Sequence, residues 1–369
     1  MHLDFAVVAD YALVDQAGKI SVLGIFQHIW VQQFPAMHPR LHLVLRLKGK
    51  RTEVGEHHVQ IRLVNEQNTE ILGGTGSVSF AEPPAGVTDI EAGAILVFDV
   101  RSVTKSIVCA LAGLAVRDGL LPGVTASIAP YLAPTDTLDA VDSTVTVQQL
   151  LTMTSGYQWN EDTGPDYNTW IAADNHVQYL LDRPHATAPG VTFTYNSAAV
   201  HTLGVVLQDA AALPLPQYAA PLFAALGVGD TVGWEALDRG TVNGGAGIQL
   251  RGRDLLKFGQ LFLQRGWSGD RRVVPQDWVD EATRPHFAWR RAVGPLSRVT
   301  YGMLWWVSDE TPAAFFAWGY GGQFVYVVPT RDLVVVATTD WSGLTEVTPQ
   351  VLAATALGVI VNDVVPAAR

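Results

Sequence analysis

The stretch Ser102-Val103-Thr104-Lys105 begins a helical pattern, with apolar residues at 107, 108, 111, 114 and 115 before Gly119. Residues three apart in a helix share one face, so the Ser102 hydroxyl and the Lys105 amine are predicted to be neighbours. The helix N-terminus favours an alkoxide, and an apolar helix body lowers the pKa of a lysine beside it. A surface helix cap gives the same pattern, but Lys105 is the only one of five lysines that follows a serine at this spacing. The spacing favours an activated serine nucleophile.

Two kinds of pattern lie on either side of this stretch. Residues 1–100 alternate β-branched and aromatic residues between turn formers, which predicts a β-rich domain with strands at Ile20 to Phe26, His42 to Lys48, His57 to Val64, Gly76 to Phe80 and Ala94 to Val100. Residues 101–369 predict helices near 146–153, 198–212, 252–265 and 348–362, and strands at Tyr301 to Val307, Ala313 to Trp318, Gln323 to Val328 and Leu333 to Thr338. Helices enclosed by strands indicate an α+β domain with an antiparallel sheet.

Composition narrows the classes of function. The chain has 369 residues and a net charge of −11, which disfavours nucleic acid and anionic membranes as partners. No apolar run reaches the roughly 18 residues of a spanning helix, and the start at Met1 to Phe5 shows no secretory signal, so we expect a soluble, cytoplasmic protein. The single cysteine, Cys109, lies in an apolar run and is predicted to be a buried thiol.

Two further segments could contribute to a site. Phe193-Thr194-Tyr195-Asn196-Ser197 follows Pro189-Gly190 and precedes a helical run, which predicts a turn whose tyrosine points into a cleft or packs in the core. Trp318-Gly319-Tyr320-Gly321-Gly322-Gln323 lies between two predicted strands. It could be a simple hairpin turn, or a strand edge that a ligand approaches and whose backbone N–H binds an oxyanion.

Other chemistries lack their motifs. The sequence has no G-x-S-x-G, no H-E-x-x-H, no Walker loop and no complete G-x-G-x-x-G. His57 and His58 would face opposite sides of a strand, and no second ligand cluster follows them. We therefore expect neither a metal nor a cofactor.

The ordered set S-V-T-K, Leu150-Leu151-Thr152-Met153-Thr154-Ser155-Gly156, F-T-Y-N-S and W-G-Y-G-G-Q resembles the serine β-lactamase-like family from about residue 101 onward. That family includes class C β-lactamases, DD-peptidases and esterases. The Y-x-S triplet, the GYQWNED stretch at 156–162 and the absence of any lysine after Lys257 are most similar to the carboxylesterase and 6-aminohexanoate-dimer hydrolase group. The resemblance implies the β-lactamase/DD-peptidase fold, in which helices flank an antiparallel sheet.

The same resemblance implies roles for individual residues. Ser102 would be the nucleophile, Lys105 and Tyr195 the proton-transfer pair, and the backbone N–H groups of Ser102 and Tyr320 the oxyanion hole. Which of Lys105 and Tyr195 is the free base stays open. Further oxyanion or substrate-binding positions would be Ser197, Trp318, Gly319, Gly321 and Gly322.

The predicted function is an esterase or amidase for small substrates that works through a Ser102 acyl-enzyme. A β-lactamase or DD-peptidase is the alternative within the family, although the third motif lacks the lysine that holds a substrate carboxylate in relatives. A catalytically inactive fusion is the other alternative, because hydrolases of this family place a helix and two strands before the S-x-x-K helix. Residues 1–99 resemble an uncharacterised bacterial β-rich family instead. The sequence predicts no oligomeric state.

Overall fold

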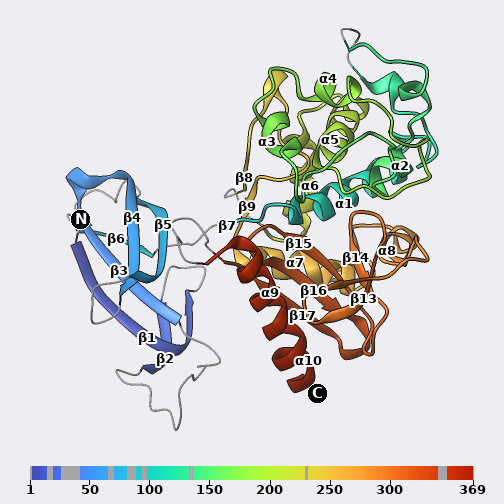
Figure 1. The fold of residues 1–369 in the computed structure, drawn as a ribbon. Helices are drawn as coiled ribbons and strands as arrows, with labels where there is room; N and C mark the ends of the chain where they lie inside the picture. Colours follow the sequence, from blue (N-terminus) through green and yellow to red (C-terminus); the bar gives the residue numbers. More distant parts are fainter. Residues whose placement is uncertain are drawn as a thin grey trace. The chain divides into compact units, whose positions relative to one another are not determined.

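The computed structural model describes residues 2–14, 20–25, 42–64, 70–80, 89–93, 98–132, 134, 136–228, 232–339 and 347–368. The chain divides into two compact units (Figure 1). The first consists of residues 1–97 with 342–344, and the second of residues 98–341 with 345–369.

The first unit is built from antiparallel strands. Four of them form a sheet in the order β2-β1-β3-β6, with bounds β1 His2–Val14, β2 Ile20–Ile25, β3 His42–Lys50 and β6 Asp89–Gly93. A separate hairpin pairs β4 (Gly55–Val64) with β5 (Glu70–Phe80), and the short 3₁₀ helix η1 (Arg51–Glu53) precedes it. Strands β2 to β5 overlap predicted strands, whereas β1 and β6 were not among the predicted ones. Phe26 and residues 94–97 of the prediction lie outside the described residues.

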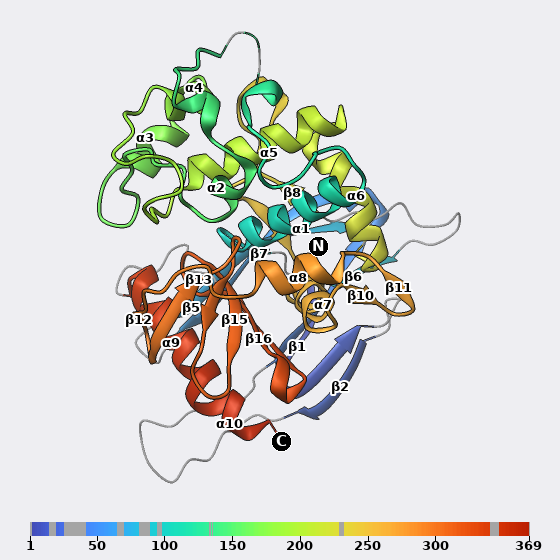
Figure 2. The same ribbon diagram turned by 90° about the vertical axis from the view of Figure 1, so that its right-hand side faces the viewer.

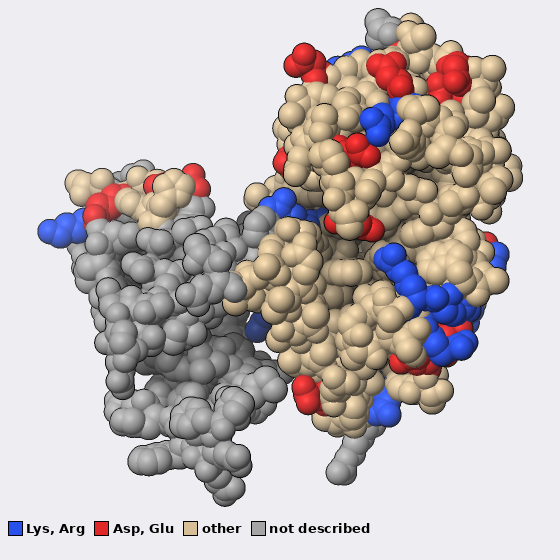
Figure 3. Space-filling view, viewed as in Figure 1, with Lys and Arg blue, Asp and Glu red and all other residues tan. Residues whose placement is uncertain are grey.

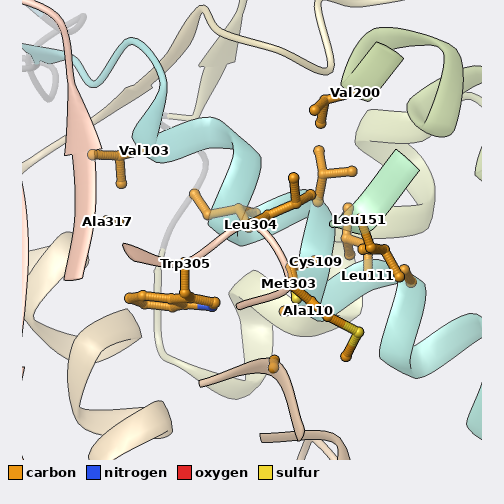
Figure 4. Packing of buried hydrophobic residues seen from close by; sticks show 14 of the residues in the cluster. Val103, Cys109, Ala110, Leu111, Leu151, Val200, Met303, Leu304, Trp305 and Ala317 are labelled. Atoms are coloured by element: carbon orange, nitrogen blue, oxygen red, sulfur yellow. The ribbon is translucent and has the colours of Figure 1, made fainter. Parts of the chain in front are cut away.

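The second unit has a helical part centred on two buried helices, α1 (Val103–Arg117) and α5 (Ser197–Ala211). Every residue of α1 from Val103 to Ala115 is buried, so this helix has no solvent face over most of its length. Figure 4 shows α1 side chains packed between Val200 of α5, Trp305 and Ala317. The other helices of this part are α2 Val147–Leu151, α3 Asp166–Ile171, α4 His176–Leu181 and α6 Leu215–Ala225, with 3₁₀ turns η2 Ala129–Tyr131, η3 Asp142–Thr144 and η4 Asp238–Gly240.

The other part of this unit is a six-stranded antiparallel sheet. Its order is β12-β13-β14-β15-β16-β17, with bounds β12 Arg291–Val293, β13 Leu296–Tyr301, β14 Trp306–Ser308, β15 Ala314–Gly319, β16 Gln323–Val328 and β17 Leu333–Ala337. Helix α7 (Gly252–Leu263) lies on one face and α9 (Pro349–Val359) on the other, as Figures 1 and 2 show. This is the predicted α+β architecture.

Shorter elements complete the second unit. Strands β7 (Phe98–Asp99), β9 (Ile248–Leu250) and β8 (Gly233–Trp234) form a small sheet in that order. The remaining elements are β10 Trp267–Ser268, β11 Arg271–Arg272, α8 Gln276–Ala282 and η5 Pro329–Arg331. Because β7 leads directly into α1, this small sheet fixes the start of the helix that carries Ser102.

The predicted single strand from Tyr301 to Val307 is wrong. The chain turns between β13 and β14, where the Gly302 N–H donates to the Trp305 carbonyl at 2.9 Å and Leu304 has a φ of 56°. A Cβ on Gly302 would lie 2.2 Å from a backbone carbonyl oxygen, so glycine is needed at this turn. The sequence pattern does not reveal the turn, because the apolar residues continue through it and those before, within and after the turn are buried.

The C-terminal helix continues from α9 through a π-helical turn, Ile360–Val364, into α10, Val365–Ala367. Over Pro349–Ala367 it is long and apolar enough to cross a membrane, which the sequence analysis did not anticipate. Ala353, Leu357 and Ile360 are buried in the unit. A helix of a folded core meets the same criterion, so this feature alone does not indicate a membrane.

Candidate active site

The start of α1 is held in a tight backbone turn. Arg101 has a φ of 49°, which is unfavourable for a residue other than glycine. Its N–H donates to Asp99 Oδ1 at 2.8 Å, and its Nε lies 3.2 Å from Asp99 Oδ2. Ser102 follows as the N-cap residue and is partly exposed. The strained turn therefore places the partly exposed Ser102 at the N-terminus of a buried helix.

Lys105 lies one turn further along and is almost completely buried, with 1% of its surface exposed. Its Nζ donates to Ser102 Oγ at 2.7 Å, to Ser197 Oγ at 2.8 Å and to the Gly245 carbonyl at 2.7 Å. Burial lowers the pKa of Lys105 to about 8, although the Glu161 and Asp162 carboxylates oppose this shift. The amine is thus fixed in place and loses its proton at mildly alkaline pH, well below the ordinary range of lysine.

Tyr195 lies in the loop before α5 and joins the same group. Its hydroxyl shares a hydrogen bond with the Ser102 side chain, and its ring centroid is 4.9 Å from Lys105 Nζ. Burial raises the pKa of Tyr195 well above its ordinary value, and the Glu161 carboxylate adds to the effect. The ring stacks on Trp306 at 5.8 Å. The structure therefore brings Ser102, Lys105 and Tyr195 together.

The segment 150–156 holds the loop that carries Tyr195. The Thr194 N–H donates to the Met153 carbonyl at 2.8 Å, and the Asn196 N–H points at Met153 Sδ at 3.4 Å. A Cβ on Gly156 would lie 2.4 Å from the Thr187 carbonyl, so glycine permits the two loops to touch. Asn196 caps the N-terminus of α5, because its Oδ1 accepts from the Ala199 N–H at 2.9 Å. Ser197 is therefore the first helical residue.

The glycine-rich turn lies next to the start of α1. It joins β15 to β16, and Gly321 and Gly322 have φ values of 81° and 103°, which favour glycine. A Cβ on Gly319 would lie 2.3 Å from the Val100 carbonyl, so the strand end touches the backbone two residues before Ser102. Tyr320 is 48% exposed at the tip of the turn. Trp318, which is partly exposed, packs against Trp306 at a ring distance of 5.7 Å.

Glu161 is a site residue that the sequence analysis did not single out. Its Oε1 accepts from Ser197 Oγ at 2.7 Å, and its Oε2 accepts from the Ser197 N–H at 2.7 Å and from Trp159 Nε1 at 2.7 Å. The Ser197 hydroxyl therefore accepts a hydrogen bond from Lys105 and donates one to the Glu161 carboxylate. The only signal in the sequence was the position of this acid in the GYQWNED stretch.

A second unrecognised element is the loop Asn243-Gly244-Gly245, whose carbonyl at 245 accepts from Lys105. A Cβ on Gly245 would lie 2.6 Å from the Ser197 carbonyl, and one on Gly244 would lie 2.8 Å from the Val200 carbonyl. Both glycines allow the loop to pack directly on α5. The paired glycines in the sequence could have indicated close backbone packing. They could not have indicated that the Gly245 carbonyl accepts a hydrogen bond from Lys105.

A separate polar cluster consists of Asp139, Asp142 and His185, whose possible ligand atoms lie within 4.8 Å of one another. Asp142 already accepts from the Tyr157 hydroxyl at 2.8 Å, from the Asp139 N–H at 2.8 Å and from His185 Nε2 at 3.0 Å. Through these hydrogen bonds the cluster connects the loops that carry Asp142, Tyr157 and His185.

The fold and these motifs have clear relatives. The profile of the family described as Beta-lactamase matches residues 84–358. This chain belongs to the Beta-lactamase family. A second profile, a family of unknown function (DUF6941), matches residues 4–104 and overlaps the first over the end of the N-terminal unit and the start of α1.

Individual relatives of this Beta-lactamase-family chain are distant. The 6-aminohexanoate-dimer hydrolase of Paenarthrobacter ureafaciens is 26% identical over 106 residues, which cover 28% of this chain and 26% of that protein. A putative 6-aminohexanoate-dimer hydrolase from Bacillus anthracis superposes with a TM-score of 0.57 at 15% identity, covering 83% of this chain and 78% of its own. The β-lactamase/D-alanine carboxypeptidase of Yersinia pestis gives 0.58 at 18% identity, with 85% and 93% covered. Such likeness supports the shared fold.

Proposed function

We propose that this protein is a serine hydrolase that cleaves small esters or amides through an acyl-enzyme on Ser102. The observation that carries the proposal is the contact between Lys105 Nζ and Ser102 Oγ at 2.7 Å, made by a lysine whose burial lowers its pKa to about 8. A neutral amine at this distance can accept the serine proton at moderately alkaline pH.

The two proton-transfer residues take different roles in this proposal. Lys105 is the base, because its pKa is lowered toward neutrality while the pKa of Tyr195 is raised. Ser102 Oγ attacks the carbonyl carbon as its proton moves to Lys105 Nζ. Tyr195, protonated and hydrogen-bonded to Ser102, donates its proton to the leaving oxygen or nitrogen and regains one from Lys105. Water then attacks the acyl carbon by the reverse route.

Charge on the tetrahedral intermediate requires hydrogen-bond donors. In the described residues the Ser102 backbone N–H has no acceptor within the protein, as is usual at a helix N-terminus. The N–H of Tyr320 is the second proposed donor, supported by the close approach of Gly319 to the segment before Ser102. Two such donors stabilise the oxyanion more than they stabilise the ground-state carbonyl.

An inactive fusion would leave these groups apart. The structure instead joins Ser102, Lys105 and Tyr195 by hydrogen bonds, and β17 extends the sheet beside β16. These contacts support an active hydrolase over a purely structural role. Its relatives include a 6-aminohexanoate-dimer hydrolase and a β-lactamase/D-alanine carboxypeptidase, which is compatible with amide substrates.

The test is intact-mass spectrometry after brief exposure to p-nitrophenyl acetate and to a fluorophosphonate. We expect one adduct on the wild type, no adduct on Ser102→Ala, and a retained adduct on Ser106→Ala, whose hydroxyl donates to the Leu304 carbonyl instead of facing Lys105. A folded wild type that gains no mass from either reagent contradicts the proposal. A parallel incubation with a β-lactam distinguishes a β-lactamase or DD-peptidase, which would also be acylated by it.

A further inference from the structure

A pocket of about 440 Å³ lies in the helical part, where residues of α5, of the start of α6 and of the turn η4 line it. Its volume is in the range of small-molecule sites. The polar lining includes His201, Asp209, Asp238 and Arg239, and the apolar lining includes Val205 and Leu213. None of the three residues of the proposed catalytic group lines it. The pocket is therefore separate from the candidate active site.

His201 contributes an unusual atom to this pocket. The residue is fully buried, and its Nδ1 lies 3.2 Å from the Val242 carbonyl. Because a carbonyl only accepts, Nδ1 carries the ring proton. Burial lowers the pKa of His201 to about 4, so the ring has no second proton at neutral pH. Nε2 is thus an acceptor to which no described residue donates, and buried polar atoms in native proteins seldom stay without a partner.

The charges around the pocket favour a positively charged ligand. Three carboxylates line it, those of Asp136, Asp209 and Asp238, and Arg239 is the only Lys or Arg among its described lining residues. Arg239 lies 2.8 Å from Asp136 and 3.6 Å from Asp238, so the acids of the pocket neutralise it. Asp209 is exposed, and no ion pair joins it to another described residue. Figure 3 shows further Asp and Glu side chains on the helical part, around the place of α4 in Figure 1.

A protonated primary amine fits these conditions. Its N–H groups can donate to Nε2, and its charge complements the carboxylates, which would repel an anion. An alkyl chain on the amine would contact the apolar lining, where Leu213 is 45% exposed. A metal ion would need several ligand atoms close together. The group of this kind found in the described residues, Asp139 with Asp142 and His185, does not include His201.

We propose that this pocket binds a small primary ammonium compound, which donates an N–H to His201 Nε2 and places its alkyl chain against Val205 and Leu213. The inference does not depend on the proposed function. The site nevertheless shares two elements with the catalytic lysine. His201 lies one turn beyond Ser197 on α5, and Val242 precedes the loop whose Gly245 carbonyl accepts from Lys105. The test must therefore distinguish this pocket from the active site.

The test uses three probes that share one butyl chain. Butylammonium has a charge and N–H donors, butyltrimethylammonium has the charge without donors, and butan-1-ol has a donor without the charge. Calorimetric titrations of the whole chain at pH 7 measure the three Kd values. We expect butylammonium to bind about tenfold more tightly than either of the others. Equal affinity for butylammonium and butyltrimethylammonium overturns the proposal, and so does the absence of butylammonium binding at millimolar concentration.

His201→Asn tests the acceptor, because the shorter amide can still donate to the Val242 carbonyl but has no atom at the place of Nε2. We expect butylammonium affinity to fall about tenfold, with folding checked by circular dichroism. Asp209→Asn should weaken binding about threefold, and Asp270→Asn, at an exposed acid outside the pocket, should not. Unchanged affinity in both pocket variants overturns the proposal. If His201→Asn does not fold, the comparison of Asp209→Asn with Asp270→Asn decides alone.

An ammonium bound in the active site would depend on Glu161 instead. Glu161→Gln should bind butylammonium as the wild type does, and a loss of binding there overturns the assignment to this pocket. His201-dependent binding of ZnCl₂ without binding of butylammonium would make the pocket a metal site and also overturn the proposal. These titrations need no turnover. A wild type that binds butylammonium through His201 and is acylated by no ester would contradict the proposed function alone.

Discussion

The two sides of the candidate active site are built by different forces. The helical side joins Ser102, Lys105, Ser197 and Glu161 through hydrogen bonds of 2.7 to 2.8 Å. The sheet side places Gly319 by close backbone contact and Trp306 by ring stacking. We therefore expect hydrogen bonds on the helical side to govern proton transfer and packing on the sheet side to position the substrate. Substitutions on the helical side should therefore change the pH dependence, whereas those on the sheet side should change rate or specificity.

The largest effect is expected for Lys105→Met, which keeps the length of the side chain and removes the amine. Loss of a general base costs about 10²–10⁴-fold in acylation rate. In the fold the pKa of Lys105 is about 8, below its ordinary 10.5, so this group destabilises the fold when charged and the penalty is relieved as the pH rises from about 8 to 10.5.

The Lys105→Met variant should accordingly melt at the same temperature as the wild type or higher at pH 7, as followed by circular dichroism. Lys257→Met, at an exposed lysine, should retain full activity. Retention of more than a tenth of the acylation rate by Lys105→Met would exclude the lysine as base.

A second large effect is expected for Gly319→Ala on the sheet side. The added methyl would lie 2.3 Å from the Val100 carbonyl, so the turn must move away from the helix start. Displacement of an oxyanion donor lowers kcat by about 10²–10³-fold. Gly358→Ala on α9, where a Cβ meets nothing within 4 Å, is the matched control and should be active. Equal kcat values for the two variants would show that the turn does not bind the oxyanion.

An intermediate effect is expected for Glu161→Gln. The carboxylate raises the pKa of Lys105 against the effect of burial, so its loss should move the ascending limb of the pH–rate profile from about pH 8 to lower pH. The amide also cannot accept from both the N–H and the hydroxyl of Ser197, so we expect the plateau rate to fall about tenfold.

Asp162→Asn is the control for charge alone, because Asp162 is exposed and also raises the pKa of Lys105. It should shift the profile less and keep the plateau. If Glu161 acts through Ser197, the double variant Glu161→Gln with Ser197→Ala should be no slower than Ser197→Ala alone. Additive losses would argue for a separate role of the carboxylate.

The smallest effect is expected for Trp306→Leu, which removes the ring stacked on Tyr195. Aromatic pairs contribute about 0.5–1.5 kcal/mol, so kcat/KM should fall about two- to tenfold without a change in the pH midpoint. Trp306→Phe keeps an aromatic face and should lose less. A shifted pH midpoint in Trp306→Leu would mean that the sheet side also controls proton transfer.

The sequence predicted the parts of this site that depend on local spacing. One helical turn separates Ser102 from Lys105, and the glycines of the 319–322 turn follow a strand of ordinary pattern. The α+β fold class and the family were also predicted correctly. The catalytic roles of these residues stay predictions until the variants are measured.

The contacts that the sequence did not predict are long-range. Glu161 meets Ser197 across 36 positions, and Gly245 meets Lys105 across 140, so no local period relates them. The turn at 302–305 was missed for a different reason, because its residues are as apolar as those of the strands beside it. The turn needs no polar side chain for its Leu304 N–H, which donates to the Leu151 carbonyl of the helical part. Tertiary hydrogen bonds replaced the polar residues that usually indicate a turn.

The burial of Cys109 gives the molecule a natural reporter. It is the only thiol of the chain, it is fully buried as predicted, and burial raises its pKa to about 12. It lies one turn beyond Lys105 on α1, so a thiol reagent can reach it only when this helix separates from its neighbours. The rate of thiol labelling in the native protein would therefore measure how often the helix that carries Ser102 and Lys105 opens, without any substrate or engineered label.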